Sequence, residues 1–203
     1  MFRSVLLSFL LLTLSANAQN ADVRILRSIY SAEAKPADPV FQFITDSHVI
    51  VIVGAPLAMG VTALITHNDE LLNQTMELGA ASALNLGMTY LLKHSINRDR
   101  PATTYPDIIF PKSSEGSPSF PSGHTSSSFA AATSLSLMYP KWYVIAPSFL
   151  WAGSVGYSRI YLGVHYPSDV AVGALLGAGS AWVAHKANQW YQTKHKAKHG
   201  KFE

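Results

Sequence analysis

The 203-residue chain contains no cysteine, and only 13% of its residues are Asp, Glu, Lys or Arg. Without cysteine it has no disulfide framework, no thiolate metal site and no thiol nucleophile, and an oxidising compartment is unobjectionable. Strand-like alternation of polar and apolar residues is also missing from its long Ala-, Leu-, Gly- and Ser-rich stretches. The lysines gather in the tail without interleaved aromatic residues, so the sequence gives no support to nucleic-acid binding.

What the chain has instead is a series of helical stretches that end at Pro and Gly. We therefore expect an all-α fold, an antiparallel bundle of about five to six long helices. The segment 36–46 should lead into the first long helix, and Ala102–Ser119, rich in Pro and Ser, should form the one long loop. The expected helical ranges are Asp22–Ala34, His48–Thr66, Glu70–His94, Gly123–Tyr139, Trp142–Tyr157 and Ser168–Tyr191.

Residues 1–18 have the pattern of a secretory signal peptide. Arg3 precedes the apolar run Val5–Leu14, and Ala16-Asn17-Ala18 is a small-x-small cleavage site. An uncleaved N-terminal anchor is the alternative. Residues 19–203, about 185 residues with a basic tail, then form one domain, because no linker or internal repeat divides them.

Three short segments carry the residue types of phosphoryl-transfer chemistry. That chemistry depends on positioning and on cations that stabilise the charged equatorial oxygens. Two arginines offer planar forks of donors, and a lysine adds a point charge. A Ser-Gly-His turn before a helix offers backbone N–H groups to an anion. The segments are Lys93 with Arg100-Pro101, then Pro121-Ser122-Gly123-His124, then Ser158-Arg159 with His165 and Asp169.

The two histidines and the carboxylate suggest a division of roles. Asp169 follows His165 by four residues, so it can accept from one ring nitrogen and leave the other as a lone pair facing phosphorus. Neutral imidazole can serve as the nucleophile. His124 is then the acid that protonates the leaving group. A lone histidine is more often structural, and each segment alone is weak, but all three in this order are very unlikely to arise by chance.

These segments resemble the type-2 phosphatidic acid phosphatase (PAP2) family, which shares its active site with the vanadium haloperoxidases. The resemblance covers roughly Leu71–Ala187, and no motif position departs from the family pattern. It implies that His165 forms a phosphohistidine supported by Asp169, and that His124 protonates the leaving group and later activates water. The residues it implies for phosphate binding are Lys93, Arg100, Ser122, Gly123 and Arg159. No metal and no cofactor are assigned.

The expected helix order places all these residues at one end of the bundle. Lys93 ends one helix and His124 begins the next, while Ser158 ends the following one and Asp169 opens the last. In an up-and-down bundle with short connections, alternate helix ends lie on the same side. We therefore expect one active site at one end.

Four uncharged runs of about fifteen to eighteen residues approach the length of a membrane span. The lysine-rich tail should lie in the cytoplasm by the positive-inside rule. We therefore expect a bacterial-type inner-membrane protein whose active site faces the periplasm. The acidic turn His67–Glu70 argues against this, and the alternative is a soluble periplasmic enzyme. The runs are Val49–Thr66, Leu78–Leu92, Trp142–Ser158 and Val170–Ala184.

The expected activity is metal-independent hydrolysis of phosphomonoester or diphosphate groups, with a phosphorylated membrane lipid or a small phosphomonoester as substrate. Phosphatidic acid, phosphatidylglycerol phosphate, polyprenyl diphosphate and lipid A phosphates are not distinguished, and the sequence does not address oligomeric state. The alternatives are a non-specific acid phosphatase, a vanadium-dependent haloperoxidase and a catalytically silent bundle. The haloperoxidases of the family are much larger, and a silent protein has no reason to hold three cations around two histidines.

Overall fold

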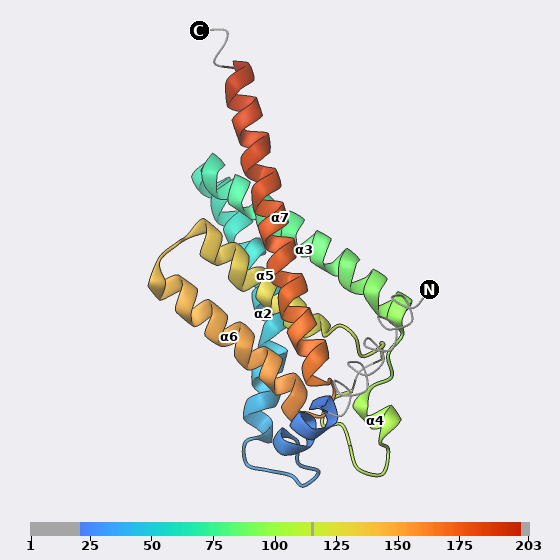
Figure 1. Cartoon of the computed structure of the whole chain (residues 1–203). Coiled ribbons are helices and arrows are strands. Elements are labelled where there is room, and N and C mark those ends of the chain that lie inside the picture. Colours follow the sequence, from blue (N-terminus) through green and yellow to red (C-terminus); the bar gives the residue numbers. More distant parts are fainter. Residues whose placement is uncertain (1–20, 115, 200–203) are drawn as a thin grey trace, which may run out of the picture.

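The computed structural model describes residues 21–114 and 116–199, and within them every regular element is a helix (Figure 1). The five long helices confirm the all-α bundle predicted from the sequence. The predicted signal peptide lies outside the described residues. A helical segment at 21–29 is followed by α2 (Asp38–Thr66), α3 (Asp69–Ile96), the short α4 (Pro101–Thr104), α5 (Gly123–Met138), α6 (Trp142–Tyr161) and α7 (Pro167–His199).

Several helix boundaries differ from the predicted ones. The first long helix begins at Asp38 rather than His48, because Pro39 lies in the first turn, where it costs no hydrogen bond. Helix α6 continues past Tyr157 to Tyr161 and ends before Gly163, whose φ of 74° is left-handed. The predicted long loop contains α4, and α7 continues to His199.

Helix α5 is the centre of the bundle, in contact with α2, α3, α6 and α7. Its contact with α7 depends on small residues. A Cβ atom at Gly177 would lie 2.0 Å from the Ser126 carbonyl oxygen, and one at Gly173 would lie 2.7 Å from that of Ser122. The α7 backbone therefore packs directly on the α5 backbone, as small residues allow where two helices cross.

Helix α2 differs from the others because most of its apolar surface is exposed. Within residues 21–114 and 116–199, it alone is long and apolar enough to cross a membrane, and 6% of its apolar window is buried. Of the four uncharged runs noted in the sequence, the one in α2 meets this measure. The runs in α3, α6 and α7 are interrupted or flanked by polar, glycine and aromatic residues, which lower their mean hydropathy.

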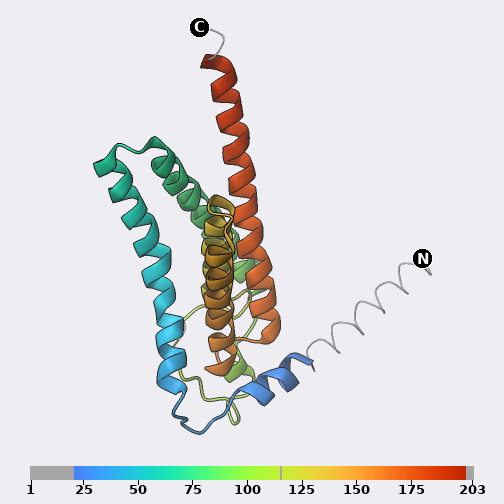
Figure 2. The same cartoon turned by 90° about the vertical axis from the view of Figure 1, so that its left-hand side faces the viewer.

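The N-terminal segment and the C-terminal end of α7 lie at opposite ends of the bundle (Figure 2). Leu26 and Tyr30 pack with Ile109, Ile160 and Tyr166 in a buried cluster beside the start of α7. The Tyr30 hydroxyl donates to the Phe110 carbonyl and accepts from the Phe110 amide, each at 2.9 Å. These contacts fix the segment against the end at which α7 begins.

Candidate active site

One end of the bundle brings the three sequence segments together. Lys93 lies in the last turn of α3 and His124 in the first turn of α5. Arg159 lies in the last turn of α6, and Asp169 lies in the first turn of α7. This is the arrangement that the helix order predicts.

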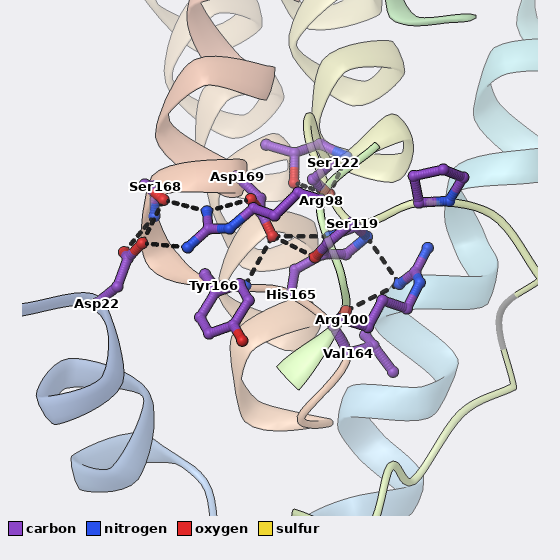
Figure 3. A network of polar contacts seen from close by, with 12 residues as sticks. Asp22, Arg98, Arg100, Ser119, Ser122, Val164, His165, Tyr166, Ser168 and Asp169 are labelled. Carbon is purple, nitrogen blue, oxygen red and sulfur yellow. Dashed lines mark hydrogen bonds and ion pairs between the residues drawn. The ribbon is translucent and has the colours of Figure 1, made fainter. Parts of the chain in front are cut away.

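His165 and Asp169 form the buried core of the site (Figure 3). His165 Nδ1 lies 3.4 Å from Asp169 Oδ2. The same carboxylate oxygen accepts from the Tyr166 amide at 2.9 Å and from the Ser119 hydroxyl at 2.5 Å. Asp169 is fully buried, and these donors hold it in a single orientation toward the imidazole.

Arg100 contacts the other nitrogen of the imidazole. Its Nη1 atom lies 3.3 Å from His165 Nε2 and also donates to the Val164 carbonyl at 2.8 Å, while Nε donates to the Ser117 carbonyl at 2.7 Å. A guanidinium has no acceptor, so this contact requires a lone pair on Nε2. The proton is then on Nδ1, facing Asp169. This is the tautomer that a nucleophilic Nε2 needs.

The surroundings of His165 also keep the imidazole neutral. Burial lowers its pKa to about 4, even though the hydrogen bond to Asp169 favours the charged form. Arg100 and Arg159 add to the lowering, because two nearby cations oppose a third. At neutral pH the lone pair on Nε2 is therefore available.

Two further cations lie in the same region. Arg159 is fully buried, and its Nη1 donates to Thr45 Oγ1 of α2 at 2.7 Å. Lys93 is buried and donates to the Pro118 carbonyl. Gly123 lies against the Lys93 side chain, since a Cβ atom there would be 3.9 Å from Lys93 Cε. Buried cations need anionic or hydrogen-bonding partners, and a phosphate would supply several acceptors at once.

Ser122 joins the start of α5 to the start of α7. Its hydroxyl oxygen caps α5, accepting from the Thr125 hydroxyl at 2.9 Å and from the Thr125 amide at 3.5 Å. Its own amide donates to the Asp169 carbonyl at 3.0 Å. The turn before α5 is thus tied through one backbone hydrogen bond to the residue that supports His165.

His124 is close to residues from several elements. Its ring lies against that of His48, with centroids 3.8 Å apart and the ring planes tilted by 44°. Burial lowers the pKa of His124 to about 2, and Arg159, His48, His165 and Arg100 add to the lowering. His48 Nδ1 lies 2.9 Å from the Thr45 carbonyl oxygen, which can only accept, so that nitrogen carries a proton. His48 and Thr45 were not predicted from the sequence. The polar tetrad 45–48 in an otherwise apolar helix was the signal available.

Three more site residues were missed. Ser119 lies in the predicted loop, and Arg98 lies inside the six-residue gap of the first segment. Arg98 Nη1 donates to Asp169 Oδ1 at 2.7 Å. Asp22, on the N-terminal segment, accepts from Arg98 Nη2 at 2.9 Å. No sequence pattern indicated that Asp22 is near the site.

The chain is similar to known proteins. The model of the PAP2 superfamily matches residues 74–193, more than half of the chain. The chain belongs to this superfamily. The resemblance found in the three segments is therefore confirmed.

Curated relatives match over shorter stretches. A lipid A 4'-phosphatase of Bacteroides thetaiotaomicron is 39% identical over 71 residues, 33% of this chain and 32% of that protein. A decaprenylphosphoryl-5-phosphoribose phosphatase of Mycobacterium tuberculosis is 38% identical over 102 residues, 49% of this chain and 53% of that protein. The matched regions thus span between about a third and a half of these relatives.

Two solved structures cover most of the chain. LpxE of Aquifex aeolicus has a TM-score of 0.66 and 29% identity, over 82% of this chain and 95% of that one. A transmembrane PAP2-type phosphatidylglycerolphosphate phosphatase of Bacillus subtilis has a TM-score of 0.71 and 25% identity, over 92% and 94%. The helical architecture is therefore shared with membrane PAP2 phosphatases.

Proposed function

We propose that this protein is a phosphatase that hydrolyses phosphomonoester or diphosphate groups of membrane lipids through a phosphohistidine at His165. One observation carries the proposal. His165 presents Nε2 to Arg100 and Nδ1 to Asp169, so a neutral nucleophile lies beside a cation that can bind phosphate oxygens. The named activities of the relatives, which act on phosphorylated lipids, agree with it.

In the first step, His165 Nε2 attacks phosphorus and forms a P–N bond while the bond from phosphorus to the leaving oxygen breaks. The bound phosphate offsets the nearby cations, so that His124 is protonated in the complex and gives its proton to that oxygen. The leaving group departs as an alcohol or, from a diphosphate, as a lipid monophosphate. Lys93, Arg100 and Arg159 stabilise the negative charge on the equatorial oxygens. Asp169 stabilises the positive charge that develops on the His165 ring.

In the second step, His124 accepts a proton from water as the water oxygen attacks phosphorus. The P–N bond breaks, the electron pair returns to His165 Nε2, and inorganic phosphate is released. Both histidines return to their initial protonation states, so no oxidant, reductant or metal is needed for the balance. Metal independence remains a prediction.

A lipid substrate is supported by an apolar groove between α2 and α6. The groove has a volume of about 340 Å³, and Phe41, Ile44, Leu150 and Tyr157 are among its lining residues. Ile44 is adjacent to Thr45, which contacts Arg159 of the site. An apolar groove on the same helix that contacts Arg159 suits a substrate that has an anionic head and a hydrocarbon chain.

Membrane insertion, with the catalytic end outside the inner membrane, belongs to the same proposal. Helix α2 supplies a span-length apolar surface, and α7 runs from the catalytic end toward the lysine-rich tail. If that tail is cytoplasmic, as the positive-inside rule favours, the catalytic end is periplasmic.

Replacement of the nucleophile tests the mechanism. We expect His165→Ala to reduce phosphate release from a nitrophenyl phosphate to background, and Asp169→Asn to retain weak activity because the imidazole remains. His94→Ala is the matched control, because His94 is exposed beside Lys93. Labelled phosphate should stay on the wild-type protein in an alkaline quench but not on His165→Ala.

Two results would contradict the proposal. Near-normal turnover by His165→Ala would remove the phosphohistidine mechanism. Loss of wild-type activity in EDTA, restored by a divalent metal, would contradict metal independence.

A further inference from the structure

Asp169 is linked to a second carboxylate, that of Asp22, through Arg98. Its Oδ1 atom accepts from Arg98 Nη1 at 2.7 Å, so Arg98 is the cation that balances this buried charge. Arg98 is itself only partly covered, with 24% of its side chain exposed. A flexible arginine at the surface would lose orientation unless other groups held it.

Asp22 holds Arg98 from the side opposite Asp169 (Figure 3). Asp22 Oδ2 accepts from Arg98 Nη2 at 2.9 Å and from the Ser168 hydroxyl, while Oδ1 accepts from the Ser168 amide at 2.8 Å. Arg98 Nη1 also donates to Ser168 Oγ at 2.7 Å, and the guanidinium lies 4.0 Å from the centroid of the Tyr166 ring. We call Asp22, Arg98 and Ser168 the Asp22 clamp.

The clamp also caps α7 from a distant part of the chain. Ser168 is in the first turn of α7, and its amide is one of the donors that the helix cannot satisfy internally. Asp22 satisfies that donor and places a negative charge at the helix N-terminus. The helical segment 21–29 can hold Asp22 there because Leu26 is buried beneath it, in the cluster with Ile109 and Tyr166.

We propose that Asp22 is a positioning residue for catalysis, which acts through Arg98 on the orientation of Asp169 and so of His165. The inference rests on the proposed function. Asp22 touches neither the imidazole nor the cations assigned to phosphate. Its loss should therefore slow the chemical step and leave phosphate binding intact.

The test compares kcat, KM and the inhibition constant of inorganic phosphate in clamp variants. Asp22→Asn removes the charge and places an amide NH₂ group against the N–H and O–H donors of Arg98 and Ser168. We therefore expect kcat to fall about 10- to 100-fold, the range typical of residues that support a catalytic group. KM and phosphate inhibition should change less than about threefold. Asp22→Glu keeps the charge and should recover part of kcat. Arg24→Gln, on the exposed side of the same segment, is the matched control.

Arg98→Lys tests the connection between the two carboxylates. Lysine keeps the charge but lacks the planar fork, so it cannot hold Asp22 and Asp169 together. We expect a kcat loss similar to that of Asp22→Asn. The double variant should lose less than the product of the two single losses, because both changes break one unit. If Asp22→Asn does not fold, Asp22→Glu and Arg98→Lys carry the same comparison.

Several outcomes would overturn the inference. One is a lower thermal stability of Asp22→Asn with unchanged kcat per folded molecule. The clamp would then stabilise the fold without positioning Asp169 for catalysis. Another is an equal loss of kcat and of phosphate binding. Wild-type protein without phosphatase turnover would overturn the proposed function first, and this inference with it.

Discussion

At the scale of single residues, His124 concerns the leaving group. If His124 is the acid, its loss matters most when the leaving oxygen needs a proton to depart. We expect His124→Ala to lower kcat/KM for an alkyl phosphate by about 100- to 10,000-fold, the usual range for general acid–base catalysis. Nitrophenyl phosphate should lose less, because its leaving group is stable as an anion. Equal losses on both substrates would assign His124 to phosphate binding.

The depressed pKa of His165 predicts the acid limb of the pH profile. The nucleophile must be neutral, and with a pKa of about 4 it remains so until the pH falls through that value. The acid limb of kcat/KM should therefore lie near pH 4 rather than near 6.5. Profiles for two phosphate esters separate this limb from substrate ionisation, because a substrate pKa of about 6 changes with the ester. A limb near pH 6.5 with both esters would contradict the burial argument.

The residues of the three segments could be predicted because their chemistry lies in short, ordered patterns. The residues that support them could not. Arg98 is one more charge in a basic stretch, and Asp22 is 76 residues from Arg98 and 146 from Ser168 along the chain. Such contacts follow from tertiary packing. Short sequence patterns predict contacts only between residues that are close in the sequence.

At the scale of elements, the contact between α5 and α7 should be intolerant of a single methyl group. In Gly177→Ala, the new carbon would lie 2.0 Å from the Ser126 carbonyl oxygen, so one backbone must move. We expect a loss of about 1–3 kcal/mol, the usual cost of overpacking. Thermal unfolding in detergent measures it.

Gly179→Ala is the control for that measurement. A Cβ atom at Gly179 meets nothing within 4 Å, so alanine should be neutral or stabilise α7 by up to about 1 kcal/mol through helix propensity. Equal midpoints for the two variants would mean that α5 and α7 can separate without cost.

Helix existence was predictable from composition, but helix ends were less so. The expected start at His48 was too late, and Thr45 and His48 both lie within α2, where they contact Arg159 and His124. Pro39 in a first turn and polar residues at 45–48 are each compatible with a helix start, so the sequence did not decide between the two positions. The contacts with Arg159 and His124 explain why Thr45 and His48 are polar.

At the scale of the whole molecule, the proposed orientation predicts which residues a reagent can reach. Ser114→Cys lies in the exposed loop before α5, at the catalytic end, and Thr193→Cys lies on the exposed far part of α7. In cells with an opened outer barrier, an impermeant thiol reagent should label only Ser114→Cys. Thr193→Cys should react once the inner membrane is broken. The natural chain has no cysteine, so it supplies an unlabelled background.

A wash at high salt or alkaline pH tests insertion separately. A helix buried in lipid is not held by ion pairs, so the protein should stay in the membrane fraction. Release into the soluble periplasmic fraction would favour a soluble enzyme with the same chemistry. Labelling of Thr193→Cys alone, in cells with an opened outer barrier and an intact inner membrane, would invert the orientation.

The hydrogen bond from the Ser122 amide to the Asp169 carbonyl has a consequence for what the site can accept. It joins the turn that carries His124 to the turn that supports His165, and the close packing of Gly173 under Ser122 prevents that joint from sliding. In the proposed mechanism, this backbone contact should limit how far His124 and His165 can move apart. A limited distance between the two histidines selects for the size of the phosphate group and does not depend on the length of the attached lipid chain. Lipids with different tails should then have similar kcat values and differ mainly in KM.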